Sequence, residues 1–136
     1  VSTQGVGQDW LTEAWLSYYD IFVRNAFGNY HDVLREVTYS PIMGLYLTHV
    51  FSSSYAYNGH FPNENYGREL MQLFSIGLEE LNPDGTPRLD AGGAPLPTYD
   101  NSDILNFARI LTGFNYQDPR SNQEYGGANL VDPMWI

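Results

Sequence analysis

Residues 9–27 have the sequence DWLTEAWLSYYDIFVRNAF, and this stretch decides the expected fold. Its polar residues recur at steps of three or four, which puts them on one stripe of an α-helix; they are Asp9, Glu13, Ser17, Asp20 and Arg24. Almost all the rest of the circumference is apolar or aromatic, and a helix of that kind is normally buried among neighbours. We therefore predict a helix over residues 9–27 whose apolar sides are covered by the remainder of its own domain or by another subunit.

Capping residues and apolar periodicity predict four further helices. They begin near four residues that favour helix starts, which are Asn29, Ser40, Asn63 and Asp100. The helix from Asn63 is expected to stop at Gly77, and residues 82–97, rich in Pro and Gly, predict a loop or small hairpin. No internal repeat is visible. The sequence thus predicts an all-α fold with about five helices, as part of a larger helical domain.

Composition limits the classes of partner. With 136 residues, 43% of them apolar, the chain is long enough for one domain with a core. Sixteen acidic residues against six basic ones give a net charge of −10, which opposes binding to nucleic acid or anionic lipid. No apolar run approaches the roughly eighteen residues that cross a bilayer, so we expect no membrane insertion. The absence of cysteine excludes disulfides and thiolate ligands.

The two ends of the chain suggest a piece of a longer domain. The first residue is Val1 and not Met, and the last three are apolar: Met134, Trp135 and Ile136. We therefore expect residues 1–136 to form a single partial domain whose N- and C-terminal parts are missing.

Charged residues on the fourth predicted helix are the first candidates for a functional site. Glu64 and Arg68 are four residues apart with the acid first, the order that favours a surface ion pair. Glu69 falls at the edge of the apolar side, where an unpaired charge costs several kcal/mol. Its best partner is Arg109 on the fifth helix, so we predict a Glu69 to Arg109 contact. With this pair we group three polar residues near the start of the fourth helix, which are Arg68, Asn63 and Asn65.

Two interpretations of these charges stay open. A buried ion pair fixes the register of two helices, whereas a polarised acid beside arginine in a pocket binds or processes a polar substrate. As paired carboxylates of a hydrolase, Glu64 and Glu69, with His60 nearby, are weak catalytic candidates. The two glutamates lie about 140° apart around the helix, so they do not converge without a further partner.

Metal ligands are only weakly indicated. The three histidines, His31, His49 and His60, share no helical ligand spacing, which argues against zinc. Asp100 and Asp103 could hold calcium, but their spacing is not that of an EF-hand loop, and helix capping explains them more simply. We predict no cofactor, with calcium at these two residues as the minor alternative.

Two separated motifs carry a family resemblance. Residues 62–77, PNENYGRELMQLFSIG, are followed by Asp103-Ile104 and by residues 108–114, ARILTGF. Together they resemble the bacterial family known as domain of unknown function 1800, and so do shorter stretches upstream. Gly67 replaces the usual alanine of that family and Phe114 the usual tryptophan. The resemblance implies a longer protein with a secretion signal, and hence an extracytoplasmic location, but no mechanism.

These observations favour a non-catalytic helical scaffold or binding module of a secreted bacterial protein, engaged in protein–protein interaction. The alternative is a hydrolase that acts on an extracellular polymer through carboxylates. An open pocket that holds Glu64, Arg68, His60 and Arg109 would favour the hydrolase, whereas mutually paired charges would favour the scaffold.

Overall fold

The computed structural model describes residues 11–120 and 128–136. These residues form six helices: α1 Thr12–Arg24, α2 Tyr30–Tyr39, α3 Pro41–Tyr46, α4 Tyr55–Asn58, α5 Asn65–Gln72 and α6 Asn101–Ile110. The β structure of the described ranges consists of isolated bridges, so the predicted all-α class is confirmed. No helix in these ranges has the length and apolar character needed to span a bilayer.

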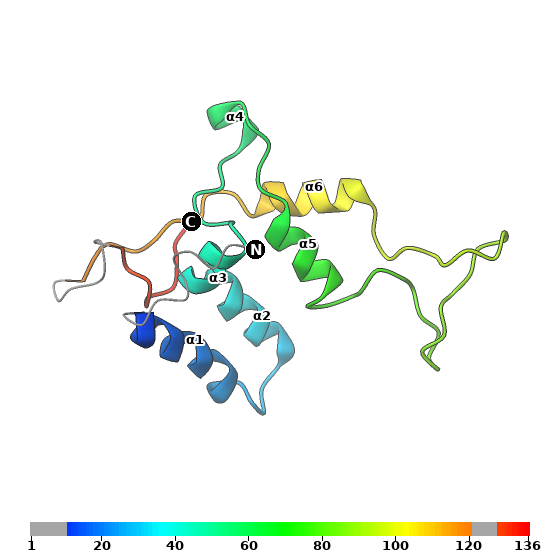
Figure 1. Ribbon diagram of the computed structural model, residues 1–136, viewed down its shortest axis with the longest axis horizontal. Coiled ribbons are helices and arrows are strands. Elements are labelled where there is room, and N and C mark those ends of the chain that lie inside the picture. Colours follow the sequence, from blue (N-terminus) through cyan, green and yellow to red (C-terminus); the bar gives the residue numbers. More distant parts are fainter. Residues whose placement is uncertain (1–10, 121–127) are drawn as a thin grey trace.

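The helices form two groups that share a core. α1, α2 and α3 pack against one another, and α5 packs against α6 (Figure 1). α4 projects from this body, and residues 78–98 extend from it as a long arm. Both helix groups and the C-terminal segment contribute to the core cluster, whose buried members include Ile21, Val37, Met43, Tyr66, Leu111, Phe114 and Met134. The core therefore joins segments that are distant in sequence.

Local signals set most helix ends. The Asn29 side chain accepts a hydrogen bond from the N–H of His31 at 2.9 Å, and Pro41 opens α3, both as expected. α5 ends earlier than predicted, at Gln72. The chain then turns through several residues to Gly77, whose φ of 76° lies in the left-handed region that favours glycine. α4 is a single helical turn at residues 55–58, where the sequence analysis predicted no helix.

The C-terminal residues return to the helical body. The N–H of Met134 donates to the carbonyl of Tyr39 at 2.7 Å, and Asn115 and Trp135 form an isolated antiparallel bridge. Met134 is buried, whereas Trp135 and Ile136 are half-exposed. Of the three apolar residues at this end, one thus belongs to the core.

The imidazole of His49 occupies the centre of the core. It is 0% exposed and stacks on the ring of Tyr66 with centroids 4.1 Å apart, while Phe114 approaches its edge at 5.3 Å. Its Nε2 lies 2.9 Å from the carbonyl oxygen of Thr38. A carbonyl only accepts, so Nε2 carries the hydrogen and satisfies a carbonyl in the last turn of α2. The Tyr66 hydroxyl lies 2.7 Å from Oγ1 of Thr38. Thr38, His49 and Tyr66 are therefore linked to one another by two polar contacts and one ring stack.

Backbone strain surrounds this histidine. Thr48 and Phe51 both have a φ of 61°, in the left-handed region that residues with a Cβ rarely occupy. Each such residue costs on the order of 1 kcal/mol. The bonds that oppose this cost run from Asn65 Nδ2 to Thr48 Oγ1 at 3.1 Å and from the N–H of Phe51 to the carbonyl of Phe114 at 2.9 Å.

Gly67 sets the distance between α5 and α6. A Cβ at this position would lie 3.1 Å from Cβ of Phe107 and 3.5 Å from the backbone N of Ala108. The first distance is shorter than ordinary contact, so glycine lets the two helices approach more closely than a larger residue would.

The arm contains an internal repeat that the sequence analysis missed. Residues 81–88 (LNPDGTPR) and 89–96 (LDAGGAPL) form the same turn twice, with the N–H of the second residue bonded to the carbonyl of the sixth at 2.8 Å in both. The fifth residue is a glycine with positive φ in each unit, 84° in Gly85 and 86° in Gly93. The sequence correctly predicted a loop or small hairpin over residues 82–97. Its prediction that the chain has no internal repeat was wrong.

We predict that His49 makes the chain less stable in mild acid. Burial lowers the pKa of His49 below its ordinary value of 6.5. Between pH 6.5 and this lower pKa the unfolded chain binds more protons, so the free energy of unfolding falls as the pH drops from neutral towards the lowered pKa of the folded chain. His49→Phe should be less stable at neutral pH by roughly 1–3 kcal/mol, since it leaves the Thr38 carbonyl unpaired. It should lose less stability on acidification.

Urea unfolding at a series of pH values measures both effects. His31→Gln is the matched control, because His31 is exposed and its ring makes no contact with the core. Equal pH dependence of the parent chain and His49→Phe would contradict the prediction.

Candidate functional site

Arg68 of α5 pairs with Glu64, the residue that precedes the helix. Arg68 Nη2 donates to Glu64 Oε2 at 2.9 Å, and both side chains are about one-third exposed, at 41% and 34%. This is the predicted surface pair. Asn63 accepts the N–H of Asn65, the first residue of α5, at 2.9 Å. His60 is exposed just beyond α4.

The predicted contact between Glu69 and Arg109 is wrong. Arg109 is exposed and its Nη1 donates to Oδ1 of Asn106 at 2.9 Å, whereas Oε2 of Glu69 is buried without a hydrogen-bond partner among the described residues. The physical reason lies in the helix geometry of α6. The buried positions Ile104 and Ala108 define its inner side, and Arg109 follows Ala108 by about 100°, on the side of Asn106.

Asp100 and Asp103 form the capping box of α6. Oδ1 of Asp100 accepts the N–H groups of Ser102 and Asp103, and Oδ2 of Asp103 accepts the N–H of Asp100 at 3.0 Å. The expected capping role is confirmed. Within residues 11–120 and 128–136, no three His, Cys, Asp or Glu side chains gather as metal ligands.

A cleft of about 520 Å³ lies elsewhere, between α1, α2 and the C-terminal segment. Three segments of the chain line it: Ala14, Ser17, Tyr18, Ile21 and Arg24 from α1; Arg35, Glu36, Tyr39, Ser40 and Pro41 from α2 and the start of α3; and Arg120, Leu130, Val131, Asp132 and Pro133. A second cleft, of about 470 Å³, lies between residues 51–57 and 112–115. None of the sequence-predicted candidates lines either cleft.

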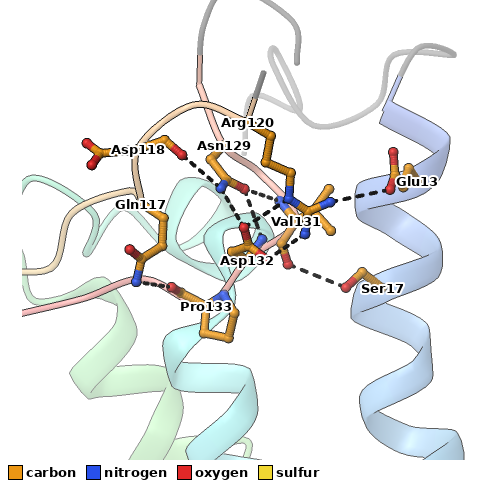
Figure 2. A network of polar contacts seen from close by, with 9 residues as sticks. All are labelled: Glu13, Ser17, Gln117, Asp118, Arg120, Asn129, Val131, Asp132 and Pro133. Carbon is orange, nitrogen blue, oxygen red and sulfur yellow. Dashed lines mark hydrogen bonds and ion pairs between the residues drawn. The ribbon is translucent and has the colours of Figure 1, made fainter. Parts of the chain in front are cut away.

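An arginine and a buried asparagine hold the C-terminal wall of the first cleft (Figure 2). Arg120 donates through Nε to Asp132 Oδ2 at 2.9 Å, and its Nη1 lies 3.6 Å from Oε1 of Glu13 on α1. Asn129 is 1% exposed. Its Nδ2 donates to the Asp118 carbonyl and to Asp132, and its Oδ1 accepts the N–H of Asp132 at 3.0 Å.

An ion pair between Arg24 and Glu36 forms the opposite wall of the cleft. Arg24 Nε donates to Oε2 of Glu36 at 2.7 Å and ties α1 to α2, while Asn25 Nδ2 donates to Oε1 at 2.9 Å. The bond from Arg24, the bond from Asn25 and the positive charges of Arg24 and Arg35 lower the pKa of Glu36.

Both carboxylates of the cleft are held as anions. Hydrogen bonds from Arg120 and then Asn129 lower the pKa of Asp132 to about 2. General acid and base groups need a pKa near the working pH. Asp132 and Glu36 therefore act as fixed negative charges that orient arginines, which suits binding and not proton transfer.

None of the residues that line this cleft was predicted from the sequence as a site residue. Its arginines come from three segments that are distant in sequence, and no motif joins them. One weak signal was available: the chain has six basic residues, all arginine, and half of them line this cleft. Another was the spacing of three between Asn129 and Asp132, typical of a side chain that bonds to nearby backbone.

We predict that Asn129→Ala destabilises the chain by roughly 1–3 kcal/mol, because the N–H groups of Val131 and Asp132 lose their acceptor. Urea unfolding measures this change. Asp118→Ala is the matched control, since Asn129 bonds only the backbone carbonyl of Asp118, and it should change the free energy of unfolding by less than about 0.5 kcal/mol. Equal effects of the two substitutions would refute the role given to Asn129.

Comparison with known proteins places the chain in a family. The family model described as "Protein of unknown function (DUF1800)" matches residues 1–136. No curated protein matches the chain, and no solved structure does.

Proposed function

The chain belongs to the DUF1800 family, whose function is unknown, and we propose that it is a non-catalytic helical scaffold that associates with a second copy of itself through the outer face of α1. One observation carries this proposal: a row of large apolar side chains on α1 is exposed. The hydrolase alternative has no comparable support, because Glu64 is paired with Arg68 and Glu69 is partly buried on the same helix without sharing a cleft with it.

Three sides of α1 differ in character. Its inner side consists of Leu11, Ala14, Tyr18 and Ile21, all buried or half-buried. Its polar side carries Glu13, Ser17, Asp20 and Arg24. The remaining side is the outer face, defined by Leu16, Tyr19, Phe22 and Val23, which are 60%, 66%, 42% and 59% exposed.

The outer face has the spacing of a helix-packing surface. Its residues recur at steps of three and four, so they form one continuous strip along the helix. Single exposed apolar residues are normal on a protein surface, whereas a contiguous strip marks an interaction site. A helix is the natural partner of such a strip, since ridges of side chains on one helix fit grooves on another.

A second copy of the chain can cover the outer face with its own outer face, and no charged partner is needed. The strip itself carries no charge, so two copies related by a twofold axis would bring identical apolar residues together. The net charge of −10 on each chain opposes this association. Raising the salt from about 0.1 M to about 1 M shortens the Debye length from about 10 Å to about 3 Å, so association should strengthen with salt.

We predict a concentration-dependent dimer in analytical ultracentrifugation. The double substitution Leu16→Glu with Val23→Glu should raise the dissociation constant by more than about 100-fold, because it places charges in an apolar contact. The matched control is Leu81→Glu with Leu89→Glu on the arm, whose side chains are 58% and 57% exposed. The control should dimerise like the parent chain.

A chain that stays monomeric up to its solubility limit, at low and at high salt, would overturn this proposal. So would equal effects of the two double substitutions. Circular dichroism of each variant establishes that its helices are retained.

We also propose a secreted, extracytoplasmic bacterial protein, on the strength of the family resemblance. Cell fractionation of a bacterium that carries the protein, with antibodies against this chain, would place it in the periplasm or medium. Recovery in the cytoplasm alone would refute the location.

A further inference from the structure

We propose that the cleft between α1, α2 and the C-terminal segment binds a small molecule with a single carboxylate, about the size of a sugar acid, and that Arg35 supplies the opposite charge. This cleft lies on the inner and polar sides of α1, away from the outer face, so the two proposals are independent.

Positive charge is concentrated in this cleft against the trend of the whole chain. The chain has six basic residues against sixteen acidic ones. The cleft is lined by three arginines, Arg24, Arg35 and Arg120, and by two carboxylates, Glu36 and Asp132. Three positive and two negative groups leave the lining with a net charge of +1 in a protein of net charge −10.

Two of the three arginines form ion pairs with the carboxylates of the lining, so the net positive charge of the lining lies on the third arginine. Glu36 is bonded to Arg24, and Asp132 to Arg120, so each carboxylate of the lining is balanced by an arginine, and Arg120 also reaches Glu13 on α1. Arg35 lies next to Glu36 in the sequence and lines the same cleft. Its charge helps to lower the pKa of Glu36, but its guanidinium forms no ion pair with any described residue. Its guanidinium is thus left to bind an anion, with five N–H donors that match a planar carboxylate.

The net charge favours a monoanion. A carboxylate carries one negative charge at neutral pH, which balances the lining, whereas a phosphate monoester carries about −1.5 to −2 and would face the two fixed carboxylates of the walls. The hydrogen bonds that lower the pKa of Asp132 and Glu36 keep those walls negative at any pH near neutral.

The walls suit a ligand with both hydroxyl groups and an apolar ring face. Tyr18 and Tyr39, both half-buried, contribute aromatic surface, and Ser17 and Ser40 belong to the same lining. A volume of about 520 Å³ lies within the range of sites that bind small molecules. A six-membered sugar ring with one carboxylate combines this size, polarity and charge.

Three sugars that share one ring and differ in charge test the proposal. Isothermal titration of the chain with glucuronate should give saturable binding with a Kd in the millimolar range or below, glucose should bind at least about tenfold more weakly, and glucose 6-phosphate should bind no more tightly than glucuronate. Arg35→Gln should weaken glucuronate binding about tenfold or more, since it removes a charged hydrogen bond.

Arg88→Gln is the control for loss of one positive charge, because Arg88 lies on the arm and is bonded to Glu80. It should bind glucuronate like the parent chain. The proposal is overturned if glucuronate does not bind, if glucose 6-phosphate binds more tightly, or if Arg35→Gln and Arg88→Gln behave alike. Chemical shift changes on titration should be largest at Arg35 and Tyr39, and changes confined to other residues would also refute the site.

Discussion

The stack of His49 on Tyr66 connects all the main parts of this fold. His49 follows α3, Tyr66 belongs to α5, Phe114 follows α6, and the carbonyl that His49 binds belongs to Thr38 in α2. α1 joins the same core through Ile21, which belongs to one buried cluster with Val37 of α2. A single imidazole therefore contacts both helix groups at once. The left-handed backbone at Thr48 and Phe51 is the cost of placing this ring so deeply, and it persists because bonds from neighbouring segments hold both residues.

Local features of this fold could be predicted from sequence, and features that need distant contacts could not. The caps at Asn29 and Asp100 and the proline that opens α3 depend on residues within one turn, so they were predicted correctly. The partner of Glu69 was predicted wrongly, because the choice depended on how α6 is rotated against α5. From the sequence, His49 was considered only as a zinc ligand, and the spacing of the three histidines argued against that role. Nothing in its neighbouring residues indicates that a tyrosine seventeen positions later covers it.

The cleft illustrates the same limit for function. Its arginines balance two carboxylates that come from α2 and from the C-terminal segment, and each pair crosses at least twelve residues of sequence. A carboxylate is usually sought as a catalytic group, and the sequence candidates on α5 were chosen in that way. Here the informative group is Arg35, which forms no ion pair with any described residue of a strongly acidic chain. Composition contains that signal, but only the fold shows where the few arginines meet.

The arm of residues 78–98 has a further physical consequence. Its three extended stretches close a ring of backbone hydrogen bonds, each 2.8 Å long. The N–H of Glu80 donates to the carbonyl of Leu96, the N–H of Leu96 donates to the carbonyl of Arg88, and the N–H of Arg88 donates to the carbonyl of Glu80. These bonds link residues no more than sixteen positions apart, whereas the bond from Met134 to Tyr39 spans ninety-five. Loop closure becomes slower and entropically more costly as this separation grows. The arm can therefore assemble as a local unit before the C-terminal segment reaches the core, and it can keep its form when the body has opened.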